Sequence, residues 1–183
     1  MNWITTIKNI FFYGSYSIHN LKSIYDFINL TWIKHNLGTL YTLNIYGNVC
    51  FSERDNYSIK KYHNTHNILL HGIITDLSEA YNKNDILINP CVIGSGLKIK
   101  NIESFSFGLP IITTTIGAQG LQEFVDNESL IIINDYNEYP QVLKQLDYNK
   151  RMNIQNNIIK TYEKYFNLCT VYKNFFTILD NCI

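Results

Sequence analysis

The chain has little charge and no excess of either sign. Only 16% of its 183 residues are charged, and 15 basic residues balance 15 acidic ones. Nothing in this balance indicates the basic surface that nucleic acid requires. No run reaches the roughly 18 apolar residues of a membrane span, and the start, MNWITTIKNIFF, lacks the apolar stretch and cleavage site of a signal peptide. We therefore expect a cytoplasmic protein.

Cysteine is sparse and follows no metal-binding pattern. The four cysteines form no C-x-x-C pair, and no histidine stands beside them at the spacing of a zinc site. We expect a reduced chain without a zinc site or a disulfide framework. Cys91 adjoins a glycine loop, and we interpret it as a small residue at a strand end rather than as a nucleophile. The cysteines are Cys50, Cys91, Cys169 and Cys182.

No internal repeat, low-complexity linker or block of like charge divides the chain. With 46% hydrophobic and 14% aromatic residues, 183 residues form one sizeable core and are too few for two nucleotide-binding domains. We expect a single domain over 1–183, with its core at about 9–149 and C-terminal helices over 150–183.

Apolar runs and helical patterns alternate along the sequence, which predicts an α/β fold. We expect a Rossmann-like parallel sheet with helices on both faces and ligands at the carboxyl ends of the strands. Asp76, with Glu79 three residues on, is typical of a capping box. We expect strands at about 9–13, 41–46, 68–71, 86–89, 110–113 and 130–133. We expect helices at about 20–34, 76–81, 97–107, 139–146, 150–165 and 169–179.

The segment 85–121 carries the chemistry. Gly94, Ser95 and Gly96 follow an apolar run and allow a tight turn and a close approach to a ligand. Lys98 and Lys100 are expected in the first turn of the next helix, where each opposes the helix dipole by roughly 0.3–1 kcal/mol. A phosphate in front of the helix amides is the natural compensation.

Glu103 extends this pattern. At 100° per residue, Lys100 and Glu103 lie within about 60° of one another on the helix, together with Gly96. The two charged side chains therefore either meet a common ligand or form an i,i+3 surface ion pair worth a few tenths of a kcal/mol.

The order of these motifs resembles the donor-sugar motif of retaining GT-B glycosyltransferases of the group 1, or family 4, type. The likeness runs from about Asn9 to the C-terminal helices. The residues that carry it are Ile10–Gly14 with His19 and Asn20, Leu43–Gly47, His71–Pro90, GSGLKIK at 94–100, Glu103, GLPIITT at 108–114 and GAQGL at 117–121.

The resemblance implies one half of a GT-B fold, the second of its two Rossmann-like domains, with the N-terminal domain absent from the chain. It places Glu103 at the ribose, Lys98 and Lys100 at the diphosphate, and the backbone of Gly72–Ile74 at the nucleobase, with no metal or cofactor. The implied donor-binding residues are Gly14, Gly94, Ser95, Gly96, Lys98, Lys100, Glu103 and Thr114.

Two departures from the family pattern shift the expected roles. Ser95 stands eight positions before Glu103, where the commonest pattern has a glutamate that contacts the sugar, so loop amides and Ser95 are expected to hold the sugar. Gly14 is followed by SYSIHN instead of a segment with Arg and Lys. Lys98 and Lys100 then carry most of the positive charge.

Other polar residues are weaker candidates. Thr113, Thr114 and Thr115 can bind a ligand, although a β-branched run at a strand end is mostly structural. His19 can approach the phosphates or the acceptor. The histidines His63, His66 and His71 are expected to be solvated or to have local hydrogen-bond partners.

The resemblance implies a domain that transfers a sugar from a nucleotide diphosphate sugar to an acceptor with retention, together with a separate N-terminal domain or partner. That partner would also provide any contact with the inner membrane. A non-catalytic nucleotide-sugar-binding or assembly subunit is the alternative, and half of a nucleotide-sugar epimerase is a third reading. Without the N-terminal domain, we expect uncovered aromatic surface among Tyr162, Tyr165, Phe166, Tyr172, Phe175 and Phe176.

Overall fold

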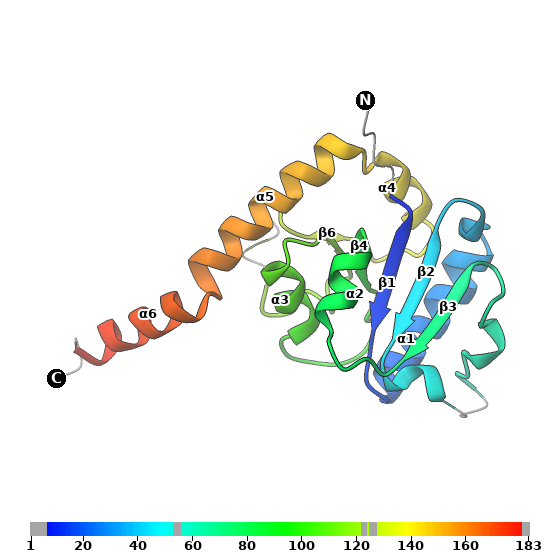
Figure 1. Cartoon of the computed structure of the whole chain (residues 1–183), viewed down its shortest axis with the longest axis horizontal. Helices are drawn as coiled ribbons and strands as arrows, with labels where there is room; N and C mark the ends of the chain where they lie inside the picture. The colour runs from blue at the N-terminus through cyan, green and yellow to red at the C-terminus, as the bar shows by residue number, and fades with distance from the viewer. Residues whose placement is uncertain (1–6, 53–55, 122–123, 125–127, 181–183) are drawn as a thin grey trace.

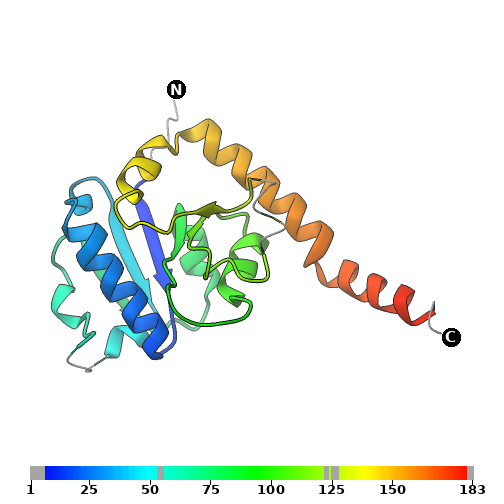
Figure 2. The same ribbon diagram turned by 180° about the vertical axis from the view of Figure 1, so that it is seen from behind.

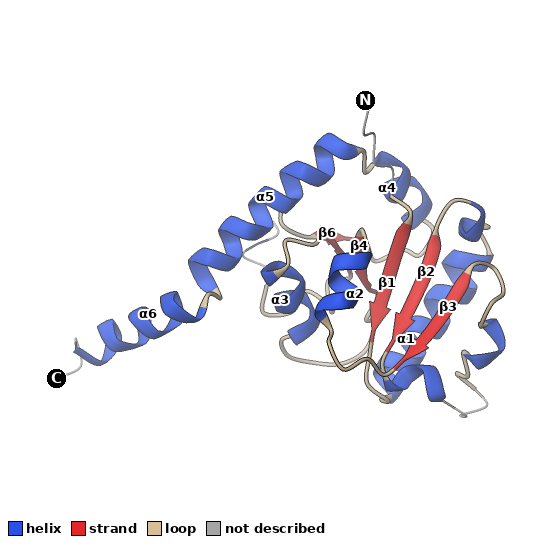
Figure 3. Ribbon diagram, viewed as in Figure 1, coloured by secondary structure: helices blue, strands red, loops and turns tan. Residues whose placement is uncertain are grey.

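The computed structural model describes residues 7–52, 56–121, 124 and 128–180. They form one parallel sheet with the strand order β3-β2-β1-β4-β5-β6 (Figure 1, Figure 3). The strands are β1 (Asn9–Tyr13), β2 (Thr42–Tyr46), β3 (Ile68–Gly72), β4 (Ile86–Asn89), β5 (Ile111–Thr113) and β6 (Ile131–Ile132).

Helices cover both faces of this sheet, which confirms the predicted α/β class. In Figure 1, α2 (Ser78–Lys83) and α3 (Ile99–Ser106) lie in front of the sheet, and α1 (Ile18–Phe27) lies behind it, as the reverse view in Figure 2 shows. Because both faces of the central strands are covered, neighbouring residues that point to opposite faces are mostly apolar and buried. Phe11 and Phe12 of β1 have no exposed surface.

The strand order reverses between β1 and β4. From β1 the chain proceeds through β2 to β3 on one side, and from β4 through β5 to β6 on the other. In open sheets of this kind, ligands bind outside the carboxyl ends of the strands at the point where the strand order reverses. In this chain that point lies between the loops that leave β1 and β4, and it is called the crevice below.

The starts of α1 and α3 differ from the prediction. The first helix begins at Ile18, with Ser17 as its cap, and continues as a π-helix over Ile28–Ile33. Trp32 is fully buried in this widened turn and donates its indole N–H to the His66 carbonyl. Helix α3 begins at Ile99, so Lys98 is the N-cap residue and does not lie in the first turn.

The expected capping box of α2 is wrong in its second half. The Asp76 carboxylate accepts a hydrogen bond from the Ser78 N–H at 2.9 Å. Glu79 does not reach back to the start of the helix and pairs with Lys83, one turn further on. Of the two expected side-chain contacts only that of Asp76 is formed, and the helix begins at Ser78.

The C-terminal helices leave the body of the molecule. After α4 (Tyr139–Gln145), α5 (Tyr148–Tyr165) passes the sheet, and α6 (Leu168–Asp180) extends beyond it as an arm (Figure 1). Tyr162 and Phe166 pack against the core. Tyr172, Phe175 and Phe176 are 55%, 53% and 57% exposed, which confirms the expectation of uncovered aromatic surface on this arm.

Within the described ranges, no helix is both long and apolar enough to span a membrane. The prediction that the chain does not start with a signal peptide concerns residues 1–12, of which 1–6 lie outside these ranges. Cys182 also lies outside them.

Candidate functional site

The crevice between β1 and β4 is framed by two loops, and the loop after β1 is tightly fitted. The Gly14 N–H donates to the Tyr46 carbonyl at 3.1 Å, which ties the end of β1 to the end of β2. A Cβ on Gly14 would lie 2.8 Å from the Phe12 ring and 3.2 Å from the Asn20 Cβ. Gly14 therefore has a packing reason to be glycine, and a contact with the donor stays a prediction.

The opposite wall of the crevice is the glycine loop 94–96. Gly94 and Gly96 have φ values of +127° and +74°, which side chains strongly disfavour. A Cβ on Gly96 would meet no atom within 4 Å, and Ser95 between the two glycines is exposed. The backbone here is free to approach a ligand.

Lys98 closes this loop on itself. Its ammonium donates to the carbonyls of Ser95 and Gly96 at 2.9 Å and 2.8 Å. The charge thus compensates loop carbonyls and lies beside the start of α3, which no side chain caps. Lys98 is placed to hold the loop, and contact with a diphosphate requires its side chain to turn.

Lys100 lies deeper in the crevice. Its Nζ donates to Asn20 Oδ1 at 3.3 Å and sits 4.4 Å from the centre of the Phe12 ring. Although the residue keeps some exposed surface, protein surrounds the ammonium, and this burial lowers its pKa to about 8, while nearby Cys91 and Glu103 oppose the shift. The described contacts of the ammonium are with neutral groups.

Glu103 lies one turn further along α3 and has a different partner. Its carboxylate accepts a hydrogen bond from the Tyr81 hydroxyl at 3.2 Å, and the Tyr81 ring stacks on Phe107 at 4.6 Å. Among the described residues, no ion pair joins Lys100 to Glu103. The surface ion pair is thus absent here, and the ribose contact stays a prediction.

Two buried asparagines, which the sequence analysis missed, fix α3 against the strand ends. Asn89, the last residue of β4, donates to Asn101 Oδ1 at 3.1 Å, and Asn101 donates to the Gly117 carbonyl at 2.9 Å. A Cβ on Gly117 would lie 2.1 Å from Thr113 Oγ1. Asn89 could have been found from the sequence, because it is a polar residue at the end of an otherwise apolar strand.

Thr114 has a structural role in the same layer. Its buried hydroxyl donates to the Cys91 carbonyl and accepts from the Gly117 N–H at 2.8 Å. The hydrogen of this hydroxyl is already engaged, so the predicted ligand contact has no support in the geometry. Cys91 is buried and donates its thiol to the Ile93 carbonyl at 3.0 Å, as expected of a small structural residue.

The expected nucleobase end lies two strands away. Gly72 has a φ of +71°, and Ile73 after it is 66% exposed. His63 accepts from the Leu70 N–H, and His71 pairs with Asn44 at 2.8 Å, which confirms local partners for these two histidines. A hollow of about 270 Å³ lies at this edge and is lined by Cys50, Phe51, Lys60, His63, Leu70, His71 and Gly72.

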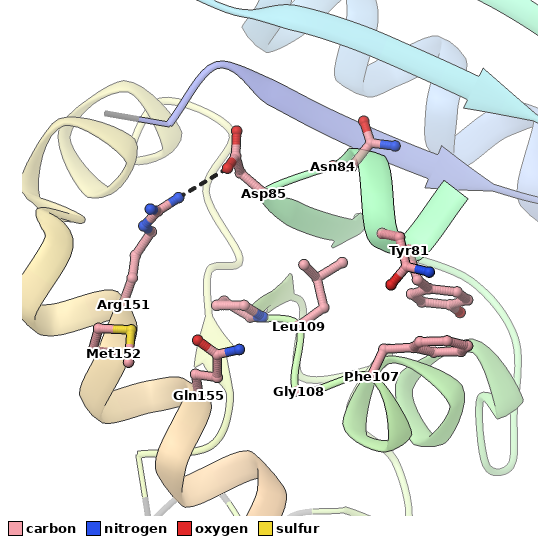
Figure 4. Close-up of a pocket in the computed structure, with 11 residues that line it drawn as sticks. Tyr81, Asn84, Asp85, Phe107, Gly108, Leu109, Arg151, Met152 and Gln155 are labelled. Carbon is pink, nitrogen blue, oxygen red and sulfur yellow. Dashed lines mark hydrogen bonds and ion pairs between the residues drawn. The ribbon is translucent and has the colours of Figure 1, made fainter. Parts of the chain in front are cut away.

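A second hollow, of about 260 Å³, lies at the amino ends of β4 and β5 (Figure 4). The Arg151 guanidinium reaches across it to Asp85 at 3.1 Å. The Asp85 carboxylate also accepts from the backbone N–H groups of Lys8 and Asn9. This hollow lies at the amino edge of the sheet, opposite the carboxyl edge that holds the crevice, and Arg151 and Asp85 in it are paired with each other.

Comparison with known proteins agrees with this geometry. The family model of glycosyl transferases group 1 matches residues 7–147. An uncharacterized 44.6 kDa protein in the cps region of Klebsiella pneumoniae is 28% identical over 132 residues, which are 69% of this chain and 34% of that protein.

Two solved structures show the same fold. HepE from Anabaena, in complex with UDP, matches with a TM-score of 0.74 at 14% identity, over 96% of this chain and 49% of HepE. The C-terminal domain of the group 1 glycosyl transferase LpcC from Francisella tularensis matches with a TM-score of 0.63 at 19% identity, over 88% and 87%. The chain spans about a third of the curated relative and about half of HepE. With its family model matched over most of its length, the chain belongs to the glycosyl transferases of group 1.

Proposed function

We propose that this chain is the donor-binding half of a retaining GT-B glycosyltransferase and binds a nucleoside diphosphate sugar in the crevice between β1 and β4. One observation carries the proposal: the buried Lys100 ammonium has neutral contacts and lies beside the uncapped start of α3. A buried cation without a bound carboxylate and a helix N-terminus both favour an anion.

The remaining parts of the donor fit around this anion. The diphosphate lies before α3 and the glycine loop, where Gly94, Gly96 and Ser95 present backbone N–H groups and a hydroxyl. The ribose hydroxyls reach the Glu103 carboxylate, whose position the Tyr81 hydroxyl fixes. The base lies towards Gly72–Ile74. HepE has been solved with UDP and with UDP-glucose, which supports a nucleotide sugar as the ligand class.

The chemistry proposed for these residues is stabilisation of the leaving group. Negative charge accumulates on the diphosphate as the glycosidic bond breaks, and fixed cations and amides stabilise that charge more than the ground state. Lys98 and Lys100 supply the cations, and in our proposal no metal ion takes part. Transfer with retention to an acceptor belongs to the same proposal.

The acceptor side of the active site comes from a second body, either a partner chain or another part of the polypeptide. That body would position the acceptor, exclude water and provide any peripheral contact with the inner membrane. The exposed aromatic side chains of α6 support this view, because such apolar surface is typical of an interaction site. They include Tyr172, Phe175 and Phe176.

A non-catalytic nucleotide-sugar-binding or assembly subunit is the alternative. The position of Ser95 favours it, since the commonest family pattern has a sugar-contacting glutamate there. Adding an N-terminal GT-B domain separates the two functions, because only a transferase half gains activity from it.

Titration calorimetry with UDP, GDP and ADP tests the donor site. We expect one of them to bind in the micromolar to millimolar range, and Glu103→Gln to weaken that binding by roughly 1.5–3 kcal/mol because a charged acceptor is lost. A sugar-transfer assay should give no product when the 183-residue chain is the only protein present. Unchanged affinity in Glu103→Gln, with the fold intact, would move the conclusion to the alternative, and robust turnover would exclude a half enzyme.

A further inference from the structure

The two walls of the crevice are joined by the side chain of Asn20. Its Nδ2 donates to the Ser15 carbonyl at 3.1 Å and approaches Ser15 Oγ at 3.2 Å, which fixes the loop after β1. Its Oδ1 accepts from Lys100 Nζ of α3, 80 residues further along the chain. The amide thus uses a donor on one wall and an acceptor on the other.

The surroundings of Asn20 are shaped for this contact. Its backbone N–H donates to Ser17 Oγ in the first turn of α1, which sets the position of the side chain. Gly14 leaves room for the Asn20 Cβ and for the Phe12 ring, over which the Lys100 ammonium lies. The Lys100 ammonium is thus held in place by Phe12, Gly14 and Asn20.

The chemical type of Asn20 matters as much as its position. An aspartate at this site would neutralise Lys100 by an ion pair and would lose the N–H groups that hold Ser15. An amide and an aromatic face hold the ammonium without a bound counter-ion. The cation is fixed, and its charge remains for an anion entering the crevice.

We propose that Asn20 is a positioning residue that fixes the Lys100 ammonium in the crevice and leaves its charge for the diphosphate of the donor. The inference rests on the proposed function for its ligand, while the contact between Asn20 and Lys100 stands on the geometry alone.

The titratable groups near Lys100 lie on or beside its own helix and on two other segments. Glu103 lies on α3 and Lys98 is its N-cap residue, Cys91 lies on the loop after β4, and Tyr81 lies on α2 and donates its hydroxyl to the Lys100 carbonyl at 3.2 Å. Burial dominates the lowered Lys100 pKa, and a bound diphosphate would raise it again. Binding should therefore weaken up to tenfold per pH unit above about 8.

Asn20→Asp tests the proposal, with Asn137→Asp as the matched control. Asn137 also accepts a hydrogen bond from a lysine, Lys34 at 2.8 Å, beside the π-helix and away from the crevice. Two readouts are needed: the Lys100 pKa in the free protein, from carbon NMR of labelled lysine assigned with Lys100→Met, and the binding of inorganic pyrophosphate, UDP and uridine as a function of pH.

We expect Asn20→Asp to raise the Lys100 pKa by at least about one unit and to weaken pyrophosphate and UDP binding about tenfold or more. Uridine binding, and both readouts in Asn137→Asp, should not change. If Asn20→Asp does not fold, Asn20→Ala replaces it and should also weaken pyrophosphate binding, because the ammonium loses its acceptor and the loop its anchor.

Two results would overturn the proposal. An unchanged Lys100 pKa in Asn20→Asp would show that Asn20 does not hold the ammonium, and a shifted pKa with undiminished pyrophosphate binding would show that the held charge does not serve an anion. If the wild-type chain binds neither pyrophosphate nor UDP, the proposed function fails, and the NMR titration still decides whether Asn20 holds Lys100.

Discussion

The two edges of the sheet treat buried charge in opposite ways. At the amino edge, Asp85 binds Arg151 and two backbone N–H groups, so each charge has its partner within the protein. At the carboxyl edge, Lys100 contacts an amide oxygen and an aromatic ring, and burial lowers its pKa to about 8. The charges of the first arrangement are neutralised within the protein, whereas the cation of the second is neutralised only when an anion binds.

This difference separates a structural hollow from a binding site better than size does. The hollow beside Arg151 is of similar volume to the one beside Gly72, about 260 Å³ against 270 Å³. Figure 4 shows the Arg151 side chain reaching across the former to Asp85. Charge compensation therefore predicts that substitutions at the amino edge lower stability and that substitutions in the crevice lower affinity.

The largest expected effect is at the amino edge. Asp85→Ala should reduce the free energy of unfolding by about 2–4 kcal/mol, because it removes the carboxylate that pairs with Arg151 and accepts from two backbone N–H groups. Urea denaturation measures this loss. The control is Glu79→Ala, which removes the exposed pair with Lys83 and should cost less than about 1 kcal/mol. Similar losses in the two variants would contradict the structural role of Asp85.

Lys100→Met should have the opposite pattern. Loss of the cation should weaken UDP binding by about 2–3 kcal/mol, because a charge-assisted hydrogen bond is lost. The free energy of unfolding should stay equal or rise, since an uncompensated buried charge is removed. Calorimetry and urea denaturation measure the two quantities. Lys22→Met is the control, because Lys22 is already paired with Asp26 and should not affect affinity.

Much of the fold could be predicted because its signals are local. Strands β1 and β4 have the predicted bounds, since Gly14 and Pro90 end their apolar runs. The predicted position of Lys98 in the first turn of α3 was wrong. Its backbone is extended and its ammonium binds loop carbonyls, so α3 begins one residue later, at Ile99. Sequence periodicity does not indicate that the Lys98 side chain will bind loop carbonyls instead of joining the helix.

The site was predictable only as far as its motif. Glycines and lysines at 94–100 mark the loop, but the contact of Lys100 with Asn20 joins segments 80 residues apart. The same holds for Tyr81, whose hydroxyl reaches Glu103 from another helix. These partners depend on the order of the strands, which places β1 beside β4, and no spacing within one segment indicates them.

Titration of Lys100 should also appear in the pH dependence of stability. Its pKa is about 8 in the folded chain against 10.5 in the unfolded chain, so between these values the unfolded chain binds more protons and the free energy of unfolding rises with pH. Burial of Cys50, whose pKa rises to about 11, acts in the opposite direction above pH 9. The difference between wild type and Lys100→Met cancels that term.

Between about pH 8 and pH 9.5, wild type should gain up to about 2 kcal/mol relative to Lys100→Met, at no more than 1.4 kcal/mol per pH unit. Urea denaturation of both proteins across this range measures the gain. A constant difference between them would show that the Lys100 ammonium is as well solvated as a surface lysine, and the contrast between the two edges would lose its basis.

The smallest effect is expected at Lys98, which lies between the two cases. Its charge is already used by the Ser95 and Gly96 carbonyls, yet it borders the proposed diphosphate site. Lys98→Ala should weaken UDP binding by about 1 kcal/mol, less than Lys100→Met, because the diphosphate must compete with those carbonyls for the ammonium. Binding of bare uridine should hardly change, and calorimetry with both ligands measures the difference. An equal loss for UDP and uridine would mean that Lys98 acts only by shaping the loop, and the diphosphate would then depend on Lys100 and the backbone of α3 alone.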